Sequence, residues 1–441
     1  MSKFTSAIYV AITVGIIWFF FGGQNKNAPA ESEKIRFLSL AWQTQAIEAN
    51  NRIVAEWNAQ HPDLQVELML GNWSIMQDFL ITGFETGDLP DIIHYESSGL
   101  VDFALRGNLL DLSPYVSEEM KTDILDVAWE LVTRSDGEII GIPFLIEPVI
   151  NIYNKDLFDD AGIIAPTYDT PWTWDDFRRA AKALTIDVDQ DGKTDQWAAA
   201  MGLRTPSYKM MSLSPGFGGS FFYYEDGDPV FRVTSAEKWL LRTFTDMLFK
   251  DKTLFPASTG LSVMGIIPGF FKGKYAVLLG PGVYVRQQMV ENAPEGFRWG
   301  VFPTPRAVTQ QAGTSGQTLS IPKNCKRPAA AMAFIEYFLN TRNMADLALG
   351  DWMVPTRKSC FELPEFQTTD DGWKDAIRAI DHAEAIAIKG LPGFREWETR
   401  AAKPVFDELF ANRLTLEEAC KRLENASNQV LRRYQNKSER W

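Results

Sequence analysis

Beyond residue 30, apolar runs typical of strands alternate with segments whose apolar residues recur at helical spacing. Residues 35–40 form a short, mostly apolar run that is typical of a buried strand, whereas apolar positions between residues 46 and 57 recur at helical spacing. A Pro-containing turn follows, and residues 66–70 then alternate apolar and polar side chains as a strand does. Residues 91–95 predict another strand, and the polar residues 96–99 after it predict a loop. This alternation predicts an α/β architecture.

Three later helices begin at recognisable signals. Thr173 and Asp176 have the spacing of a capping box, in which each side chain satisfies a free backbone N–H of the first turn. Pro328 suits the first turn of an alanine-rich helix over 328–339. Thr415 and Glu418 repeat the capping pattern before a terminal helix whose inward positions include the Cys420 thiol.

The first thirty residues differ from the rest of the chain. Lys3 precedes an apolar run over residues 4–23, and a polar stretch then ends at Ala28-Pro29-Ala30. This order is typical of a secretory signal peptide over residues 1–30. The alternative is an uncleaved N-terminal membrane anchor, because about 20 apolar residues can span a bilayer.

Composition narrows the function classes. The chain of 441 residues carries 44 Lys and Arg against 57 Asp and Glu, a formal charge of −13, which argues against a nucleic-acid binder. With 45% hydrophobic residues it can build substantial cores. Three histidines and three cysteines leave little material for a His/Cys metal site. Cys325 and Cys360 could pair if the protein is exported, or all three thiols could be free.

Five blocks in order resemble the extracellular solute-binding proteins of sugar ABC transporters, the maltose-binding protein group. The most similar block covers residues 141–158 and contains Tyr153-Asn154-Lys155. The others are residues 87–93, 171–177, 270–276 and 354–358.

The resemblance implies a type II periplasmic binding protein fold, in which two α/β lobes are joined by a hinge and enclose a ligand cleft. Residues 31–146 with about 311–360 would form the first lobe, and about 147–310 with 361–441 the second. It further implies a monomeric periplasmic protein that delivers a carbohydrate to an inner-membrane ABC permease without making or breaking bonds. The alternatives are an exported ligand-binding module of a sensory system and a glycoside hydrolase, although no spacing of acids singles out a hydrolytic pair.

Candidate ligand residues on the first lobe follow strand ends, where open α/β sheets bind ligands. Trp42 and Gln43 follow the first strand, and Tyr95, Glu96 and Ser97 follow the strand at 91–95. Flat rings suit the C–H faces of a sugar, and carboxylates or amides suit its hydroxyls. Glu147 lies in an apolar crossing segment, where an acid needs a partner, and it matches a ligand-contacting glutamate of the family.

The remaining candidates come from segments that resemble the family's cleft. Gly282 stands where a stacking tryptophan is often found, which leaves the ring of Tyr284 and puts a maltose-type platform in doubt. The other candidates, from loops and segment ends of both lobes, are Phe217, Gly219, Trp352, Arg357, Phe394 and Trp397.

An acidic loop offers one candidate metal site. Asp187, Asp189, Asp191 and Asp195 with Gly192 match the first part of a calcium loop, but Ala198 stands where the bidentate glutamate would be. The favoured interpretation is a solvated acidic turn, and the alternative is a structural calcium site remote from the cleft. No other cofactor is expected.

Overall fold

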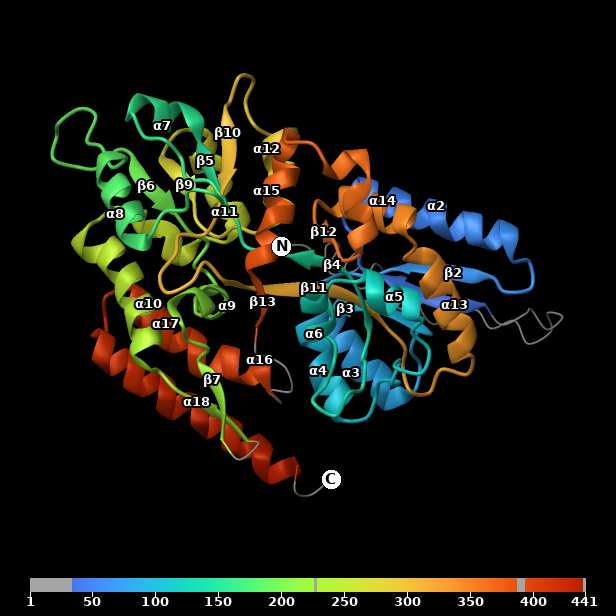
Figure 1. The fold of residues 1–441 in the computed structure, drawn as a ribbon. Coiled ribbons are helices and arrows are strands. Elements are labelled where there is room, and N and C mark those ends of the chain that lie inside the picture. Colours follow the sequence, from blue (N-terminus) through green and yellow to red (C-terminus); the bar gives the residue numbers. More distant parts are fainter. Residues whose placement is uncertain (1–33, 226–227, 387–392, 439–441) are drawn as a thin grey trace, which may run out of the picture.

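The computed structural model describes residues 34–225, 228–386 and 393–438. The predicted signal segment, residues 1–30, lies outside this range. Figure 1 shows two lobes side by side, joined near the middle by extended segments that include β4, β11 and β13. Within the described residues, no helix combines the length and apolarity needed to cross a membrane.

The first lobe is built on a sheet whose strand order is β12-β4-β11-β3-β1-β2, with β13 paired to β11. Its strands are β1 (Ile35–Ser39), β2 (Val66–Leu70), β3 (Ile92–Glu96), β4 (Ile142–Glu147), β11 (Ala312–Ser320), β12 (Val354–Pro355) and β13 (Ala383–Ala385). The helices around it are α2 (Thr44–Gln60), α3 (Met76–Thr86), α4 (Ser97–Leu105), α5 (Glu118–Asp123), α6 (Asp126–Glu130), α13 (Pro328–Phe338) and α14 (Thr341–Asp351).

The second lobe holds a four-stranded sheet of order β10-β5-β9-β6 and a separate hairpin of β7 and β8. The strands are β5 (Asn151–Asn154), β6 (Trp197–Ala200), β7 (Phe222–Glu225), β8 (Asp228–Phe231), β9 (Tyr275–Leu278) and β10 (Trp299–Phe302). Its helices are α7 (Lys155–Asp160), α8 (Trp174–Ala183), α9 (Pro206–Leu213), α10 (Ser235–Thr245), α11 (Val263–Phe271), α12 (Arg286–Glu291), α15 (Trp373–Arg378), α16 (Phe394–Trp397), α17 (Lys403–Phe410) and α18 (Leu416–Ser438).

The chain passes between the sheets after β4, between β10 and β11, and after β12. The lobe boundaries given by the sequence analysis stay a prediction. β13, from the segment assigned to the second lobe, runs parallel to β11 of the first sheet, with Ala383 opposite Ala312. The apolar core is also shared, because one cluster of buried side chains runs from β1 through Ile150 and Ile152 to Trp373. A second cluster fills the other side of the second lobe, around Trp397 and Phe406.

Local signals reproduce most of the expected elements. β1, α2 and β2 lie where the periodicity predicts them, and Thr173 and Asp176 form the expected capping box of α8. The loop predicted over 96–99 is wrong, since Ser97 begins α4. The apolar residues that follow, including Leu100 and Phe103, form the buried face of that helix. The helix therefore begins within the polar residues 97–99 instead of after them.

All three cysteines are free thiols, so the Cys325–Cys360 pair is not formed. The Cys325 thiol contacts Asp91 Oδ1 at 3.4 Å, whereas that of Cys360 contacts the carbonyl oxygen of Thr341 at 3.3 Å. Cys420 is buried in the second lobe, as its helical position predicts.

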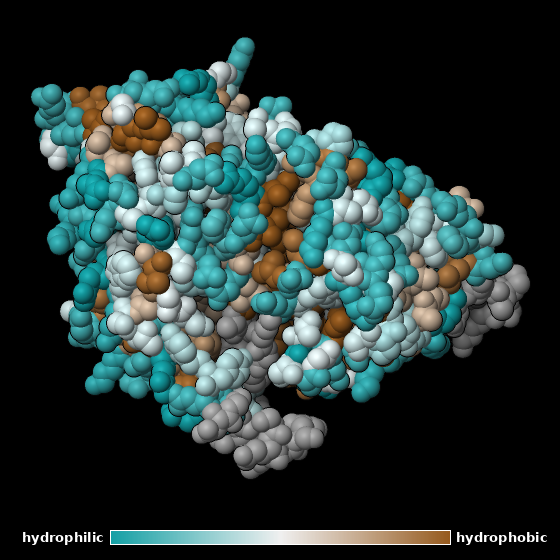
Figure 2. All heavy atoms as spheres, viewed as in Figure 1, coloured by the Kyte–Doolittle hydropathy of each residue, from teal (hydrophilic) through white to brown (hydrophobic). Residues whose placement is uncertain are grey.

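The hydropathy of the surface along the line where the lobes meet differs from that of their outer faces. In Figure 2 a hydrophobic strip follows this line beside α15, whereas the outer surfaces visible in this view are mostly hydrophilic.

Candidate functional site

A cavity of about 390 Å³ lies between the lobes, and both of them line it. The first lobe contributes side chains from α3, α4, β3, β4 and β11. The second contributes side chains from α9, α11, α16 and the short turns that carry Tyr284 and Glu398. The lining residues are Gln77, Glu96, Ser98, Gly99, Asp102, Glu147, Thr205, Tyr208, Lys209, Val263, Tyr284, Ser315, Phe394, Arg395 and Glu398.

Sheet register places two glutamates at the same edge of the first sheet. β11 lies between β3 and β4 and is antiparallel to both, so the carboxyl ends of β3 and β4 point the same way. Glu96 is opposite Gln317, and Glu147 is opposite Ser315. The two acids therefore lie on either side of β11, at the edge of the first sheet that lines the interlobe cavity.

Glu147 is a carboxylate in a poorly solvated position. Burial raises its pKa to about 7; the Lys209 ammonium opposes this rise, and the charge of Glu96 adds to it. Within the described part of the chain, no hydrogen-bond donor is seen on its carboxylate. Glu147 is half-buried and lines the cavity, so its carboxylate can accept a hydrogen bond from a ligand there.

Gly282 makes room for Glu147. Its φ is +94°, a conformation that side chains other than glycine's rarely adopt, and a Cβ there would overlap Oε1 of Glu147. A stacking tryptophan at this position is therefore incompatible with the observed placement of the carboxylate. The Tyr284 ring stands nearby, and burial together with the charge of Glu147 raises the pKa of its hydroxyl.

Glu96 belongs to a network that spans both lobes. Burial raises its pKa, the guanidinium of Arg395 lowers it, and Glu398 raises it further. One guanidinium nitrogen of Arg395 lies 3.8 Å from Oε1 of Glu96. Because Glu96 comes from β3 and Arg395 from α16, this ion pair connects the two walls of the cavity.

Two hydrogen bonds also cross between the lobes. Tyr208 on α9 donates its hydroxyl to Oγ of Ser315 on β11, at 2.8 Å. The backbone N–H of Gly393 donates to Oδ1 of Asp102 on α4, at 3.0 Å. Since these groups come from opposite lobes, separating the lobes would break both bonds.

The cavity contains four of the sequence candidates: Glu96, Glu147, Tyr284 and Phe394. Their contact with a ligand remains a prediction. Tyr95 lies behind the lining, where its hydroxyl donates to Gln77 Oε1 at 3.1 Å. Ser97 is buried and lines a small pocket beside Ser98.

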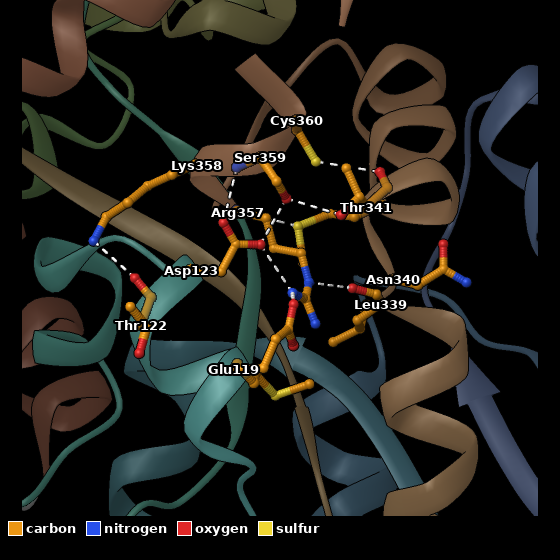
Figure 3. Close-up of polar contacts among 12 residues, drawn as sticks. Glu119, Thr122, Asp123, Leu339, Asn340, Thr341, Arg357, Lys358, Ser359 and Cys360 are labelled. Carbon is orange, nitrogen blue, oxygen red and sulfur yellow. Dashed lines mark hydrogen bonds and ion pairs between the residues drawn. The ribbon is translucent and has the colours of Figure 1, made fainter. Parts of the chain in front are cut away.

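Arg357 is placed in the core of the first lobe and not at the cavity. Its guanidinium donates to the Leu339 carbonyl oxygen at 2.6 Å, to Glu119 at 2.6 Å and to Asp123 at 2.9 Å (Figure 3). The side chain is 4% exposed. These partners explain why a charged residue on a predicted cleft loop has turned inward.

The other candidates on the first lobe also lie outside the cavity lining. Gln43 is buried and donates to the carbonyl oxygen of Asp351 at 2.9 Å. Trp352 is buried at the end of α14 and stacks on Trp373, with ring centroids 5.8 Å apart. Trp42 is 52% exposed in the segment after β1.

The second-lobe candidates that miss the cavity have roles in packing. Phe217 packs against Trp239, and the indole of Trp397 donates to Ser427 Oγ at 2.8 Å. At Gly219 the carboxylate of Glu237 approaches the backbone so closely that a Cβ there would overlap it. Large aromatic residues are often buried for packing alone, and Phe217 and Trp397 follow that tendency.

Sequence reasoning missed most of the polar lining. Tyr208 and Lys209 lie on α9, where no motif marks them, and Ser98 and Asp102 lie on α4, of which only residues 97–99 were expected to be loop. Arg395 adjoins Phe394 and Glu398 adjoins Trp397, and both aromatic residues were candidates, so the sequence did point to this segment. The residues omitted were Gln77, Ser98, Asp102, Thr205, Tyr208, Lys209, Ser315, Arg395 and Glu398.

The acidic loop lies apart from the cavity lining. Asp187, Asp189 and Asp195 place carboxylate oxygens within 4.8 Å of one another, and all three side chains are exposed. The Asp191 carboxylate instead pairs with Lys193 Nζ at 2.9 Å. Asp187 Oδ2 accepts the N–H of Gly192 at 2.8 Å, which is the local bending expected of a solvated acidic turn.

Two lobes that close a polar cavity define a class of reversible ligand-binding proteins. A model of the bacterial extracellular solute-binding protein family matches residues 41–345, more than half of the chain. The chain therefore belongs to this family.

Its relatives agree with this assignment. An uncharacterised lipoprotein of Streptomyces antibioticus is 35% identical over 413 residues, covering 92% of this chain and 89% of that protein. A maltooligosaccharide ABC transporter solute-binding lipoprotein of Streptococcus pneumoniae is 23% identical, covering 77% of this chain and 78% of that protein.

Solved structures share the fold. The sugar-binding protein MalE of Xanthomonas citri superposes with a TM-score of 0.78 at 20% identity, covering 93% of this chain and all of that one. An ABC substrate-binding protein of Listeria monocytogenes in complex with cycloalternan gives 0.72 at 21% identity, with coverages of 90% and 98%.

Proposed function

We propose that this protein binds a carbohydrate reversibly between its lobes and delivers it to the permease of an ABC importer. The observation that carries the proposal is the interlobe cavity, in which carboxylates from both walls and the cations of Lys209 and Arg395 from the second lobe accompany the rings of Tyr208, Tyr284 and Phe394. Such a lining can accept and donate hydrogen bonds at sugar hydroxyls and pack against their C–H faces. The names of the relatives, which include maltooligosaccharide and diacetylchitobiose binders, favour the same ligand class.

Binding at micromolar affinity requires about 8 kcal/mol. Several charge-assisted hydrogen bonds and one or two packed rings can supply it. Closure of the lobes is driven only by contacts that the ligand makes better in the closed state. In this role the protein is exported and captures the carbohydrate in the periplasm as a monomer, either free or held by the N-terminal segment. It then releases the carbohydrate to the permease.

The test is calorimetry against a broad panel of oligosaccharides, with the ligand recovered afterwards and analysed for chemical change. We expect saturable binding with one site and unchanged saccharide. If no saccharide binds, the proposed function is wrong. Release of shorter products would show a hydrolase, in which Glu96 and Glu147 would be the first acids to replace.

No cofactor is part of this proposal. The Asp187 loop is interpreted as a solvated turn, and a calcium titration followed by thermal denaturation tests it. A saturable rise in melting temperature that Asp187→Asn and Asp189→Asn together abolish would instead establish a structural calcium site.

A further inference from the structure

The cavity holds more acids than bases. Its lining contains the carboxylates of Glu96, Asp102, Glu147 and Glu398, against the cations of Lys209 and Arg395. A neutral sugar would leave this excess of negative charge enclosed between the lobes when they close. Removing charges from water without a counter-charge is costly, so the imbalance bears on which ligand fits.

Both cations are already engaged by the protein. The ammonium of Lys209 donates to the carbonyl oxygen of Gly280. Arg395 approaches Glu96 at 3.8 Å and also hydrogen-bonds Tyr95. Arg395 is therefore paired with Glu96, whereas the charge of Lys209 acts on Glu147 without a hydrogen bond to its carboxylate.

Three of the four acids have donors within the protein, but one does not. Asp102 accepts the N–H of Gly393 at 3.0 Å, and Glu398 accepts the Ser207 hydroxyl at 3.3 Å. Glu96 has the Ser98 side chain and the Arg395 guanidinium beside it. In the portion of the chain that the structure describes, Glu147 receives no hydrogen bond, although it lines the cavity.

We propose that the ligand carries a protonated amine, as an amino sugar does, and that this amine binds against Glu147. This inference rests on the proposed function and names the class of carbohydrate. An ammonium group brings three donors and a positive charge, whereas a hydroxyl brings one donor and no charge. A hydroxyl that donates to Glu147 leaves the negative charge uncompensated, whereas an ammonium compensates it, so Glu147 favours the amine.

The surroundings of Glu147 suit a cation in a second way. The rings of Tyr208 and Tyr284 stand close enough to Glu147 for its charge to raise the pKa of both hydroxyls, after the larger effect of burial. A cation beside an aromatic face gains further attraction. The amine would also lower the pKa of Glu147, which burial holds near 7, and so keep the carboxylate ionised.

The test compares sugars that differ in one substituent. Chitooligosaccharides of two to four glucosamine units carry free amines, their N-acetylated counterparts carry neutral amides, and the matching cellooligosaccharides carry hydroxyls at the same carbon. Calorimetry is run at pH 6 in 0.15 M salt with the full chain. We expect the amine series to bind at least tenfold more tightly than both neutral series, with a stoichiometry near one.

Matched variants locate the preference. Glu147→Gln keeps the shape of the side chain and should reduce the preference to less than threefold. Glu67→Gln removes an exposed acid on β2 of the same sheet and controls for the overall negative charge, so it should leave the preference intact. An equal effect of both variants would overturn the assignment to Glu147.

The outcomes separate the two proposals. Equal or tighter binding of either neutral series, or of maltooligosaccharides alone, would overturn the amine inference and leave carbohydrate binding in place. If neither the amine series nor any neutral saccharide binds, the proposed function is wrong and this inference falls with it.

Discussion

At the scale of single residues, burial and partners decide what a charged side chain can do. Arg357 and Glu147 both lie near ends of strands of the first sheet, and both were predicted to meet a ligand. Arg357 has two carboxylates and a carbonyl oxygen around it, whereas Glu147 has an open cavity before it. The first is therefore a structural ion pair, and the second is available for binding.

Replacing Arg357 tests its structural role. Arg357→Met keeps an apolar stem but leaves the part-buried Asp123 without its cation, and breaking a buried ion pair costs about 3–5 kcal/mol of unfolding free energy. Urea denaturation at pH 7 measures the loss. Arg342→Met, which breaks exposed pairs with Asp346 and Glu365, should cost less than about 1 kcal/mol. Equal losses would contradict the buried role.

A second buried acid gives a pH-dependent prediction. Asp351 is buried, burial raises its pKa from 3.8 to about 7, and its Oδ1 has no hydrogen-bond partner among the described residues. A folded-state pKa above the unfolded value means that the folded protein binds more protons between these two values. Its contribution to stability is therefore lost as pH rises from about 4 to 7.

Asp351→Asn should remove this dependence. We expect the variant to be more stable than the parent at pH 8, by roughly 2–4 kcal/mol, with a much smaller difference at pH 4. Denaturation in urea at the two pH values gives the comparison. A difference that does not change with pH would show that Asp351 is not protonated in the folded protein.

At the scale of elements, capping signals proved more reliable than the polarity of short segments. The box at the start of α8 is complete: Asp176 N–H donates to Thr173 Oγ1 at 3.1 Å, and Thr173 N–H donates to Asp176 Oδ2 at 2.9 Å. The polar stretch after β3 was misread because Ser and Gly occur in loops and in first helical turns alike. What makes it helical is the apolar face of α4 beyond it.

The cap of α8 can be tested directly. Thr173→Ala removes the hydroxyl that accepts from Asp176 and should cost about 1 kcal/mol of unfolding free energy. Thr173→Ser retains the hydroxyl and should lie close to the parent. Urea denaturation of the three proteins measures both, and an alanine variant as stable as the serine variant would rule out a stabilising cap.

At the scale of the whole molecule, contacts between the lobes set the balance between open and closed forms. The cavity is lined by groups from both lobes, and the Tyr208–Ser315 and Asp102–Gly393 hydrogen bonds cross it. Hinge closure of this kind is controlled by small differences in contact energy between the two states. Loss of a single crossing bond should therefore shift the population.

Tyr208→Phe removes one crossing bond while keeping the ring. We expect a larger radius of gyration for the unliganded variant in small-angle X-ray scattering, and about threefold to tenfold weaker saccharide binding, because one hydrogen bond contributes about 1 kcal/mol. Tyr223→Phe is the control, since that hydroxyl donates to Glu237 within the second lobe. Identical scattering from the two variants would show that the Tyr208 bond does not hold the lobes together.

The sequence alone determined the elements and the kind of protein. The spacing of apolar residues predicted β1, α2 and β2, and capping boxes predicted the starts of α8 and α18. Five sequence motifs in order indicated the family. These features are local, because they depend on the spacing of apolar residues along the chain and on residues that are close in sequence. Glu96, Glu147, Tyr284 and Phe394, which line the cavity, were predicted as ligand contacts because strand ends and family-like segments mark them.

Only the tertiary structure decided which of these side chains share a cavity. β11, more than 160 residues beyond β4, inserts between β3 and β4 and so brings Glu96 and Glu147 to one edge. α9 and α16 then supply Lys209 and Arg395 from the other lobe, while Arg357 turns into the core. No local pattern encodes these placements, because they depend on which distant surfaces bury each other when the chain folds.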